Sequence, residues 1–361
     1  ELLSLREQYL GNPQSEVGVL KDALEAEVSG VDGWLVRWKS EHSEVFETSL
    51  SEETEKASEE VAQGFAPFEK QEAVHAAQQA WLARLEVAWE VDKEEVLNWV
   101  TGQQSSTAQK GLRQAKDSTE VSKLPEAAGG LQGVEKLLML GSAEAKGRFE
   151  QMRAAMTTEK LKKLPLKSFH RPLSEQIKPW IDKFNRTLTP DAPALGSSRE
   201  AFEAFQKKIL SHPNHGRAVP GMSRHALGTE FDIGEIENSA FEEGGDYHDH
   251  FKWLEENAWK YGFFRPYKGG NGVAKSIQDK YGDGFVAIVE ERWHWSYYPV
   301  AQAFWELLNR HWDDYQTYLR EEVLVKSFSS SPDKDGSIPW HQVSWVADNL
   351  RMLHEGINTE L

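Results

Sequence analysis

The chain has 361 residues, of which 39% are hydrophobic and 27% charged, a balance typical of a folded soluble protein and not of a disordered or fibrous one. Its 58 acidic residues outnumber the 41 lysines and arginines and give a net charge of −17, which argues against nucleic-acid binding because that function needs a positive surface. No apolar run approaches the roughly 18 residues of a membrane-spanning helix, so we expect no membrane span.

The composition also limits the chemistry of any metal site. There is no cysteine, which excludes disulfides and thiolate ligands, so a metal would have to be held by histidine, aspartate or glutamate. The sequence begins with Glu1 in place of an initiator methionine, as expected of a processed or trimmed chain, and a removed signal peptide is one explanation.

The first 165 residues have the periodicity of helices. One apolar stripe recurs every three or four residues from Val74 to Trp89, and the opposite face carries charged and amide side chains. We therefore expect a helical bundle with its tryptophans in the core, namely Trp34, Trp38, Trp81, Trp89 and Trp99. A ligand or glycan platform built from these tryptophans is the functional alternative. The role of the helices stays open, and docking of a protein partner is one candidate.

The composition changes beyond residue 165. Pro165, Pro172 and Pro179 interrupt the chain, and we expect a linker around residues 163–174. Shorter elements follow, namely a helix over about 198–210, a turn and strand over 223–233, and a helix over 246–261 that Asp246 caps and Gly262 ends.

The remaining pattern is an extended segment at 263–267, a Gly-rich loop at 268–283, a buried strand at 285–289 and two helices at about 301–319 and 340–353. Because the helices are segregated from a small sheet, this order predicts an α+β fold. We divide the chain accordingly into residues 1–165, 166–305 and 306–361.

Two short motifs combine the residue types that bind a catalytic metal. The first runs from Ser223 to Asp232 and includes His225, and the second runs from Glu291 to His294. A catalytic zinc has three protein ligands and one open position for water, and two imidazoles with one carboxylate meet that need. A turn followed by a strand can bring His225 and Asp232 to one point, and His294 would arrive from a neighbouring strand.

The pattern S-x-H-x-x-G-x-x-x-D followed by E-x-W-H resembles the motif pair of the D-alanyl-D-alanine carboxypeptidase family of zinc metallopeptidases, the VanY-like group. These enzymes cleave the peptide part of bacterial peptidoglycan. The segment from Trp253 to Phe263 is similar to the helix and strand that the family places between its motifs. The resemblance covers about residues 195–295. It implies a small α+β zinc peptidase domain with an antiparallel sheet. The N-terminal helical bundle and the C-terminal helices lie outside the resemblance and are predicted from the sequence pattern alone.

The resemblance also implies the roles of individual residues. Those that would bind Zn²⁺ are His225, Asp232 and His294. Glu291 would be the general base. Arg199 is similar to the arginine that binds the substrate or stabilises the transition state, and Ser223 would be a hydroxyl on the substrate side or behind the ligands.

One residue departs from the family pattern. Glu230 stands where the family usually has a small residue, and in a regular strand its side chain points the same way as that of Asp232. We expect Glu230 either to pair with an arginine such as Arg217 or Arg292 or to be turned outward by a bulge.

The identity of the base raises a second question. In a regular strand Glu290 and His294 share a face, whereas Glu291 faces away. The family pattern nominates Glu291, and this choice requires a bend or bulge around Arg292.

The function implied by the resemblance is hydrolysis of peptide bonds in peptidoglycan stem peptides that contain D-amino acids. Carboxypeptidase and endopeptidase action, with D,D or L,D specificity, both stay open. Such a substrate implies an extracytoplasmic location, which is the periplasm, the cell wall or the secreted fraction. The main alternative is a non-catalytic zinc-containing module that binds the cell wall or a protein, with His248 and His250 as candidates for a fourth ligand. A helical interaction protein that carries an inactive peptidase fold is a third interpretation.

Overall fold

The computed structural model describes residues 44–117, 130–177, 179–180, 218–269, 273, 275–282, 288–326, 349–357 and 361. Residues Leu50–Leu361 form one compact unit and residues Glu1–Ser49 another, and the account below concerns the unit that begins at Leu50. None of the described helices is long and apolar enough to cross a membrane.

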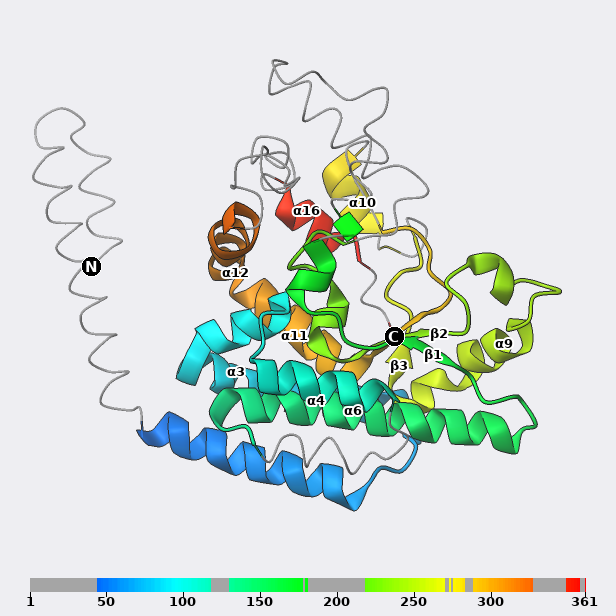
Figure 1. Cartoon of the computed structure of the whole chain (residues 1–361), viewed down its shortest axis with the longest axis horizontal. Helices are drawn as coiled ribbons and strands as arrows, with labels where there is room; N and C mark the ends of the chain where they lie inside the picture. The colour runs from blue at the N-terminus through cyan, green and yellow to red at the C-terminus, as the bar shows by residue number, and fades with distance from the viewer. Residues whose placement is uncertain are drawn as a thin grey trace, which may run out of the picture. The chain divides into compact units, whose positions relative to one another are not determined.

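The unit is mostly helical and contains one small sheet (Figure 1). Its described helices are a stretch at residues 50–63, α3 (Gln71–Thr101), α4 (Ser106–Asp117), α6 (Gly133–Thr158), α9 (His248–Asn257), α10 (Lys275–Tyr281), α11 (Tyr298–Arg310), α12 (Trp312–Tyr318) and α16 (Leu350–Glu355). Short 3-10 turns are η1 (Arg224–Leu227), η2 (Asn238–Phe241) and η3 (Ala258–Tyr261), and the π-helical turn η6 (Leu319–Val325) continues α12. The strands are β1 (Leu166–Ser168), β2 (Glu230–Ile233), β3 (Phe263–Phe264) and β4 (His294–Tyr297). The predicted α+β class, with N-terminal helices, an antiparallel sheet and C-terminal helices, is confirmed.

Helix α3 carries the tryptophans that were predicted to be buried and packs against α6 and α11 (Figure 1). Its apolar stripe points into the main hydrophobic core, as expected of an amphipathic helix. The prediction is confirmed for Trp81, Trp89 and Trp99, whereas Trp34 and Trp38 lie outside the described residues.

Helix α3 is interrupted and ended by local backbone chemistry. Asp92 leaves helical geometry, and its carboxylate accepts a hydrogen bond from the backbone N–H of Glu95 at 3.0 Å, which caps the second half of the helix. At the C-terminus Gly102 adopts the left-handed conformation with φ 88°. A side chain at Gly102 would also meet the backbone N of Leu173 at 2.7 Å, so only glycine fits this turn.

The sheet has the strand order β1-β2-β4-β3, and neighbouring strands are antiparallel. In the central pair, Asp232 lies opposite His294 and Glu230 lies opposite Ser296. Because side chains two residues apart share a face, these four polar side chains belong to one face of the sheet.

The other face of the sheet packs on α6 through aromatic rings. Phe231 stacks on Phe149 with ring centroids 4.3 Å apart, and it contacts Phe169 and Phe263 at 5.0 and 5.3 Å. A slip of one residue in the strand register would move Asp232 into this aromatic cluster. Burial of Phe231 therefore fixes which face of β2 carries the carboxylates.

A buried glutamate connects the N-terminal helices to the sheet. Glu144 on α6 accepts hydrogen bonds from Trp81 Nε1 on α3 at 2.8 Å and from Tyr297 Oη on β4 at 2.5 Å. Burial raises the pKa of Glu144. Residues on both sides of the predicted boundary at 165 thus share one core, and the division at 165 and 305 stays a prediction from the sequence pattern.

Three local predictions were wrong. The segment predicted as a linker around 163–174 contains β1, a three-residue edge strand that is too short to be recognised from its sequence and depends on pairing with β2. Helix α9 begins after Tyr247, and no side chain caps it, so Asp246 is not its cap. The predicted loop at 268–283 includes helix α10.

Other predictions agree with the structure or lie beyond it. Gly262 ends the helical segment of α9 and η3 in the left-handed conformation, with φ 83°, as predicted. The predicted helix at 198–210 and most of the predicted strand at 285–289 lie outside the described residues.

Candidate metal centre and active site

The first motif folds as a short turn followed by a strand, as its sequence predicts. Residues Arg224–Leu227 form η1, Gly228 reverses the chain with φ 70°, and β2 starts at Glu230. The turn is buried and held by side chains from α3 and from the loop between α3 and α4. Trp99 Nε1 donates to the carbonyl of Leu227 at 3.2 Å, and Gln104 Nε2 donates to the carbonyl of Ala226 at 2.7 Å.

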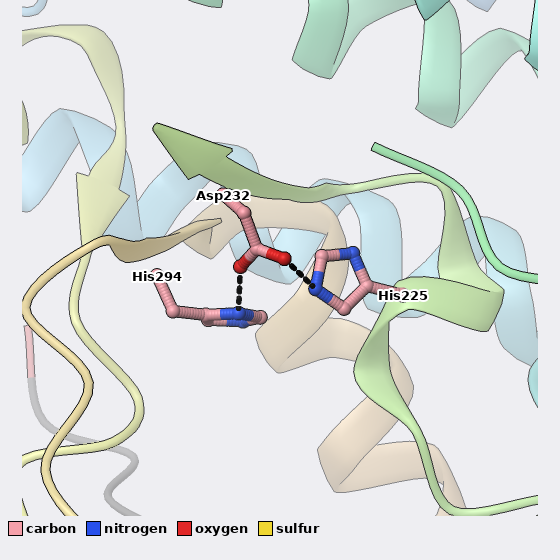
Figure 2. A group of neighbouring side chains, drawn as sticks. All are labelled: His225, Asp232 and His294. Atoms are coloured by element: carbon pink, nitrogen blue, oxygen red, sulfur yellow. Dashed lines mark hydrogen bonds and ion pairs between the residues drawn. The ribbon is translucent and has the colours of Figure 1, made fainter. Parts of the chain in front are cut away.

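The structure brings the three predicted metal ligands together. One potential ligand atom from each of His225, Asp232 and His294 lies within 4.8 Å of the others, and all three residues are buried. Asp232 stands between the histidines, with Oδ2 3.1 Å from His225 Nε2 and Oδ1 2.9 Å from His294 Nδ1 (Figure 2). Within the described part of the chain this is the one such group of three or more side chains.

In each imidazole one nitrogen faces Asp232, and the other contacts an oxygen on the opposite side of the ring. His225 Nδ1 lies 2.9 Å from the carbonyl oxygen of Phe169, which can only accept, so Nδ1 carries the hydrogen. His294 Nε2 lies 2.8 Å from Glu230 Oε2. The nitrogens that face Asp232 are therefore Nε2 of His225 and Nδ1 of His294.

Glu230 is fully buried and is not turned outward. It pairs with an arginine, as one of the two alternatives predicted, but the arginine beside it is Arg224, with Nε 3.4 Å from Glu230 Oε2. Arg292 instead pairs with Glu290 and Glu242, and Arg217 lies outside the described residues. In the sequence Arg224 directly precedes His225. Its contact with Glu230 on β2 is visible only in the tertiary structure.

The charged side chains at the centre shift one another's pKa values. Burial alone would lower the pKa of His294, but hydrogen bonds with Asp232 and Glu230 outweigh burial and raise it to about 9. Burial would raise the pKa of Glu230, yet the charge of Arg224 and the contact with His294 lower it to about 2. Burial lowers the pKa of His225, so this imidazole is neutral near pH 7.

The contact between His225 and Asp232 fits a bound cation. With Nδ1 of the neutral His225 donating to Phe169, the lone pair on Nε2 faces the Asp232 carboxylate at 3.1 Å. Two electron-rich atoms that face each other in a buried site are stabilised by a positive charge between them. The donor set of two nitrogens and one oxygen matches that of a catalytic zinc with an open position. Neither His248 nor His250 belongs to this group of neighbouring ligand atoms, and on α9 each contacts a backbone carbonyl, of Phe241 and Lys162.

The chain bends before His294 and turns Glu291 toward the centre. Residues 292–293 form a turn, which Asn238 fixes by accepting from the backbone N–H of Arg292 and donating to the carbonyl of Glu290, both at 2.9 Å. The bend that the family pattern required around Arg292 is present. Glu291 Oε2 lies 3.8 Å from His294 Nδ1, and its side chain is 10% exposed.

Glu290 points elsewhere. Its Oε1 pairs with Arg265 Nη1 at 3.0 Å and with Arg292 Nε at 3.3 Å, and its side chain is 37% exposed. In a strand running straight from residue 290 to 294, Glu290 would point toward the centre and Glu291 away from it. The turn at residues 292–293 produces the opposite arrangement.

A cation that the sequence did not nominate lies beside the ligands. Arg171 follows β1, its backbone N–H donates to the carbonyl of His225 at 3.0 Å, and its Nη2 lies 3.7 Å from Asp232 Oδ2. The side chain remains 30% exposed. The sequence pattern does not distinguish Arg171 from an ordinary linker residue. The pairing of β1 with β2 brings it next to Asp232. Arg199, the predicted cation, lies outside the described residues.

Ser223 is buried at the start of η1. It lines a cavity of about 30 Å³ with Arg224 and with Trp305 and His354 from the C-terminal helices. Its predicted role as a substrate-side or supporting hydroxyl stays a prediction. A further unpredicted neighbour is Tyr267, whose ring lies 4.5 Å from that of His294 and whose carbonyl accepts from the backbone N–H of Glu291 at 2.9 Å.

Comparison with known proteins found one family model that matches the segment containing this centre. The family model of VanY, described as D-alanyl-D-alanine carboxypeptidase, matches residues 139–300, which include both motifs. A search of curated proteins found no match. A solved structure described as VanYB in complex with D-alanine-D-alanine is 20% identical, with a TM-score of 0.29, and the match covers 49% of this chain and 81% of that one. Residues 139–300, which include the buried His225, Asp232 and His294, are therefore similar to the VanY family of D-alanyl-D-alanine carboxypeptidases.

Proposed function

We propose that the protein is a zinc-dependent peptidase that hydrolyses peptide bonds at D-amino acids in the stem peptides of bacterial peptidoglycan. The observation that carries the proposal is the buried group of His225, Asp232 and His294 with Glu291 beside it, within the segment that matches a carboxypeptidase family. Because peptidoglycan lies outside the cytoplasm, the proposal includes an extracytoplasmic location.

Each ligand has a defined atom in this proposal. His225 Nε2, one or both oxygens of Asp232, and His294 Nδ1 would hold the zinc, since these atoms face one another. When bound, zinc supplies a Lewis acid that polarises the scissile carbonyl and makes water acidic enough to react near neutral pH.

Glu291 acts as the general base in this proposal. Its Oε2 lies 3.8 Å from His294 Nδ1, at the edge of the ligand group, so it can accept a proton from the attacking water. The same carboxyl group then donates the proton to the amine that leaves. Glu290 is unsuited to this role because its carboxylate is paired with Arg265 and Arg292.

Arg171 supplies positive charge on the solvent side. Its guanidinium is partly exposed and lies 3.7 Å from Asp232 Oδ2, so it can reach a carboxylate or a developing oxyanion of a peptide bound at the centre. This role overlaps with the one predicted for Arg199, which stays a prediction, as does substrate binding by Ser223.

The test is digestion of purified peptidoglycan with mass spectrometry of the products. The wild-type chain should release products when loaded with zinc and none after chelation, and Glu291→Ala should abolish release while retaining zinc. Glu290→Ala is the matched control, because it removes the neighbouring carboxylate that points away from the centre. Activity in Glu291→Ala but not in Glu290→Ala would contradict the base assignment.

The same digestion distinguishes the open specificities. Release of single D-amino acids would identify a carboxypeptidase, and release of longer peptide fragments an endopeptidase. A zinc-loaded wild-type chain that yields no product from peptidoglycan or from synthetic stem peptides would refute the peptidase proposal in favour of a non-catalytic wall-binding module.

A further inference from the structure

One carboxylate at the centre has no assigned role in the reaction. Glu230 and Asp232 lie two residues apart on the same face of β2, and Asp232 lies directly opposite His294 on β4. The imidazole of His294 is therefore held between two carboxylates, with Asp232 Oδ1 2.9 Å from Nδ1 and Glu230 Oε2 2.8 Å from Nε2.

We propose that Glu230 is a positioning residue of the metal centre, which accepts the Nε2–H of His294 and so presents Nδ1 as the nitrogen that binds the metal. The inference rests on the proposed zinc-dependent function. Glu230 stands at a position where the family pattern usually has a small side chain.

The hydrogen bonds around Glu230 give the direction of its contact with His294. Glu230 Oε1 accepts from Ser296 Oγ at 2.7 Å and from Thr229 Oγ1 at 2.9 Å, and Arg224 lies 3.4 Å from Oε2. An ionised carboxylate can only accept hydrogen bonds, so His294 Nε2 must be the donor. A neutral His294 that keeps its hydrogen on Nε2 has its lone pair on Nδ1, toward Asp232.

Geometry excludes the alternative that Glu230 is a fourth metal ligand. It contacts Nε2, which lies on the far side of the imidazole ring from the nitrogen that faces Asp232. A metal near Nδ1, Asp232 and His225 would thus be separated from Glu230 by the ring. A carboxylate that accepts from the outer nitrogen of a metal-bound histidine fixes the ring and makes it a better ligand, and loss of such a partner lowers metal affinity by about 10- to 100-fold.

A purely structural role is the remaining alternative, in which Glu230 only neutralises Arg224. A matched control separates the two roles. Glu144 is also a buried glutamate that accepts two side-chain hydrogen bonds in the same core, but its partners are Trp81 and Tyr297 and not a metal-ligand candidate. Glu144→Gln should therefore alter stability without altering metal binding.

The experiment measures zinc affinity at one pH, by competition with a chelator, for the wild-type chain, Glu230→Ala, Glu230→Gln and Glu144→Gln. We expect Glu230→Ala to bind zinc about 10- to 100-fold more weakly. Glu230→Gln should lose less, because its amide oxygen can still accept from Nε2–H, and Glu144→Gln should match the wild-type chain. Nitrogen-15 NMR of the zinc-loaded wild-type chain should show hydrogen on Nε2 of His294 and metal at Nδ1.

The outcomes distinguish this inference from the function on which it rests. A wild-type chain that binds zinc and cuts peptidoglycan, together with a folded Glu230→Ala variant of unchanged zinc affinity, would overturn the positioning role alone. Zinc at Nε2 in the NMR spectrum of the wild-type chain would do the same, even if Glu230→Ala failed to fold. A wild-type chain that binds no zinc would overturn both proposals.

Discussion

Gly228 lies between His225 and Asp232 in the sequence. Its replacement by alanine tests how closely α6 packs against the turn η1, which carries His225. Its backbone is left-handed, with φ 70°, which costs an alanine about 1–2 kcal/mol. The new Cβ would also lie 2.5 Å from Ser142 Oγ and 3.0 Å from Leu112 Cδ2. Overpacking of this kind costs about 1–3 kcal/mol, so we expect Gly228→Ala to lose roughly 2–5 kcal/mol of folding free energy.

Ser142 cannot simply rotate away, because its hydroxyl donates to the carbonyl of Leu227 at 3.0 Å and that hydrogen bond is worth about 1 kcal/mol. The matched control is Gly244→Ala. Gly244 is also left-handed, with φ 85°, but nothing lies within 4 Å of its hypothetical Cβ, so it should lose only the backbone part, about 1–2 kcal/mol.

The assay is urea denaturation of the metal-free chain, with Ser142→Gly as the second variant of a double-mutant cycle. Replacing Ser142 by glycine removes the atoms nearest the new methyl group, so the cost of Gly228→Ala should fall by about 1–3 kcal/mol in that background. Equal losses for Gly228→Ala and Gly244→Ala, or equal losses in both Ser142 backgrounds, would refute the close contact between the turn and α6.

Three further predictions address the site and its support. In the metal-free chain the pKa of His294 is raised to about 9 in the folded state from its ordinary 6.5, so the resulting stability is fully present below pH 6.5 and is lost as pH rises through 9. The expected loss of folding free energy is on the order of 3 kcal/mol, measured by urea denaturation with a chelator at several pH values. A folding free energy that stays constant across these pH values would contradict this prediction. Arg171→Ala should lower kcat/KM about 10²- to 10³-fold while zinc affinity stays within a few-fold, with partial recovery in Arg171→Lys. A parallel loss of zinc would make Arg171 a structural residue. Phe231→Ala should cost about 3–5 kcal/mol in urea denaturation, and a cost below about 1 kcal/mol would show that the aromatic contact with α6 does not hold the sheet.

The parts of the site that are local in sequence could be predicted from it. His225, a glycine turn and a short strand place Asp232 within one motif, and the structure has that turn and strand. The bend before His294 was predicted only through the family resemblance, because the strand pattern alone nominated Glu290 and the choice of Glu291 required a bend around Arg292.

The parts that depend on strand pairing could not be predicted. Arg171 reaches the centre only because β1 pairs with β2, and β1 is too short to be recognised from its sequence. Arg224 is adjacent to His225 in sequence, but its pairing with Glu230 follows from the way that η1 turns back over β2. Asn238 holds the turn before His294 across 54 residues of sequence, a distance at which local patterns carry no information.

The contacts of Trp99 and Gln104 with the carbonyls of Leu227 and Ala226 have a consequence for how this protein can change in evolution. Segments that fold alone can be exchanged between proteins as modules, but here the turn that carries His225 is held by side chains from α3 and from the loop after it, which lie outside residues 139–300. A recombination event that joined this segment to unrelated N-terminal helices would leave buried carbonyls without donors. We therefore expect the N-terminal helices and residues 139–300 to be inherited together, with compensating changes on both sides of these contacts.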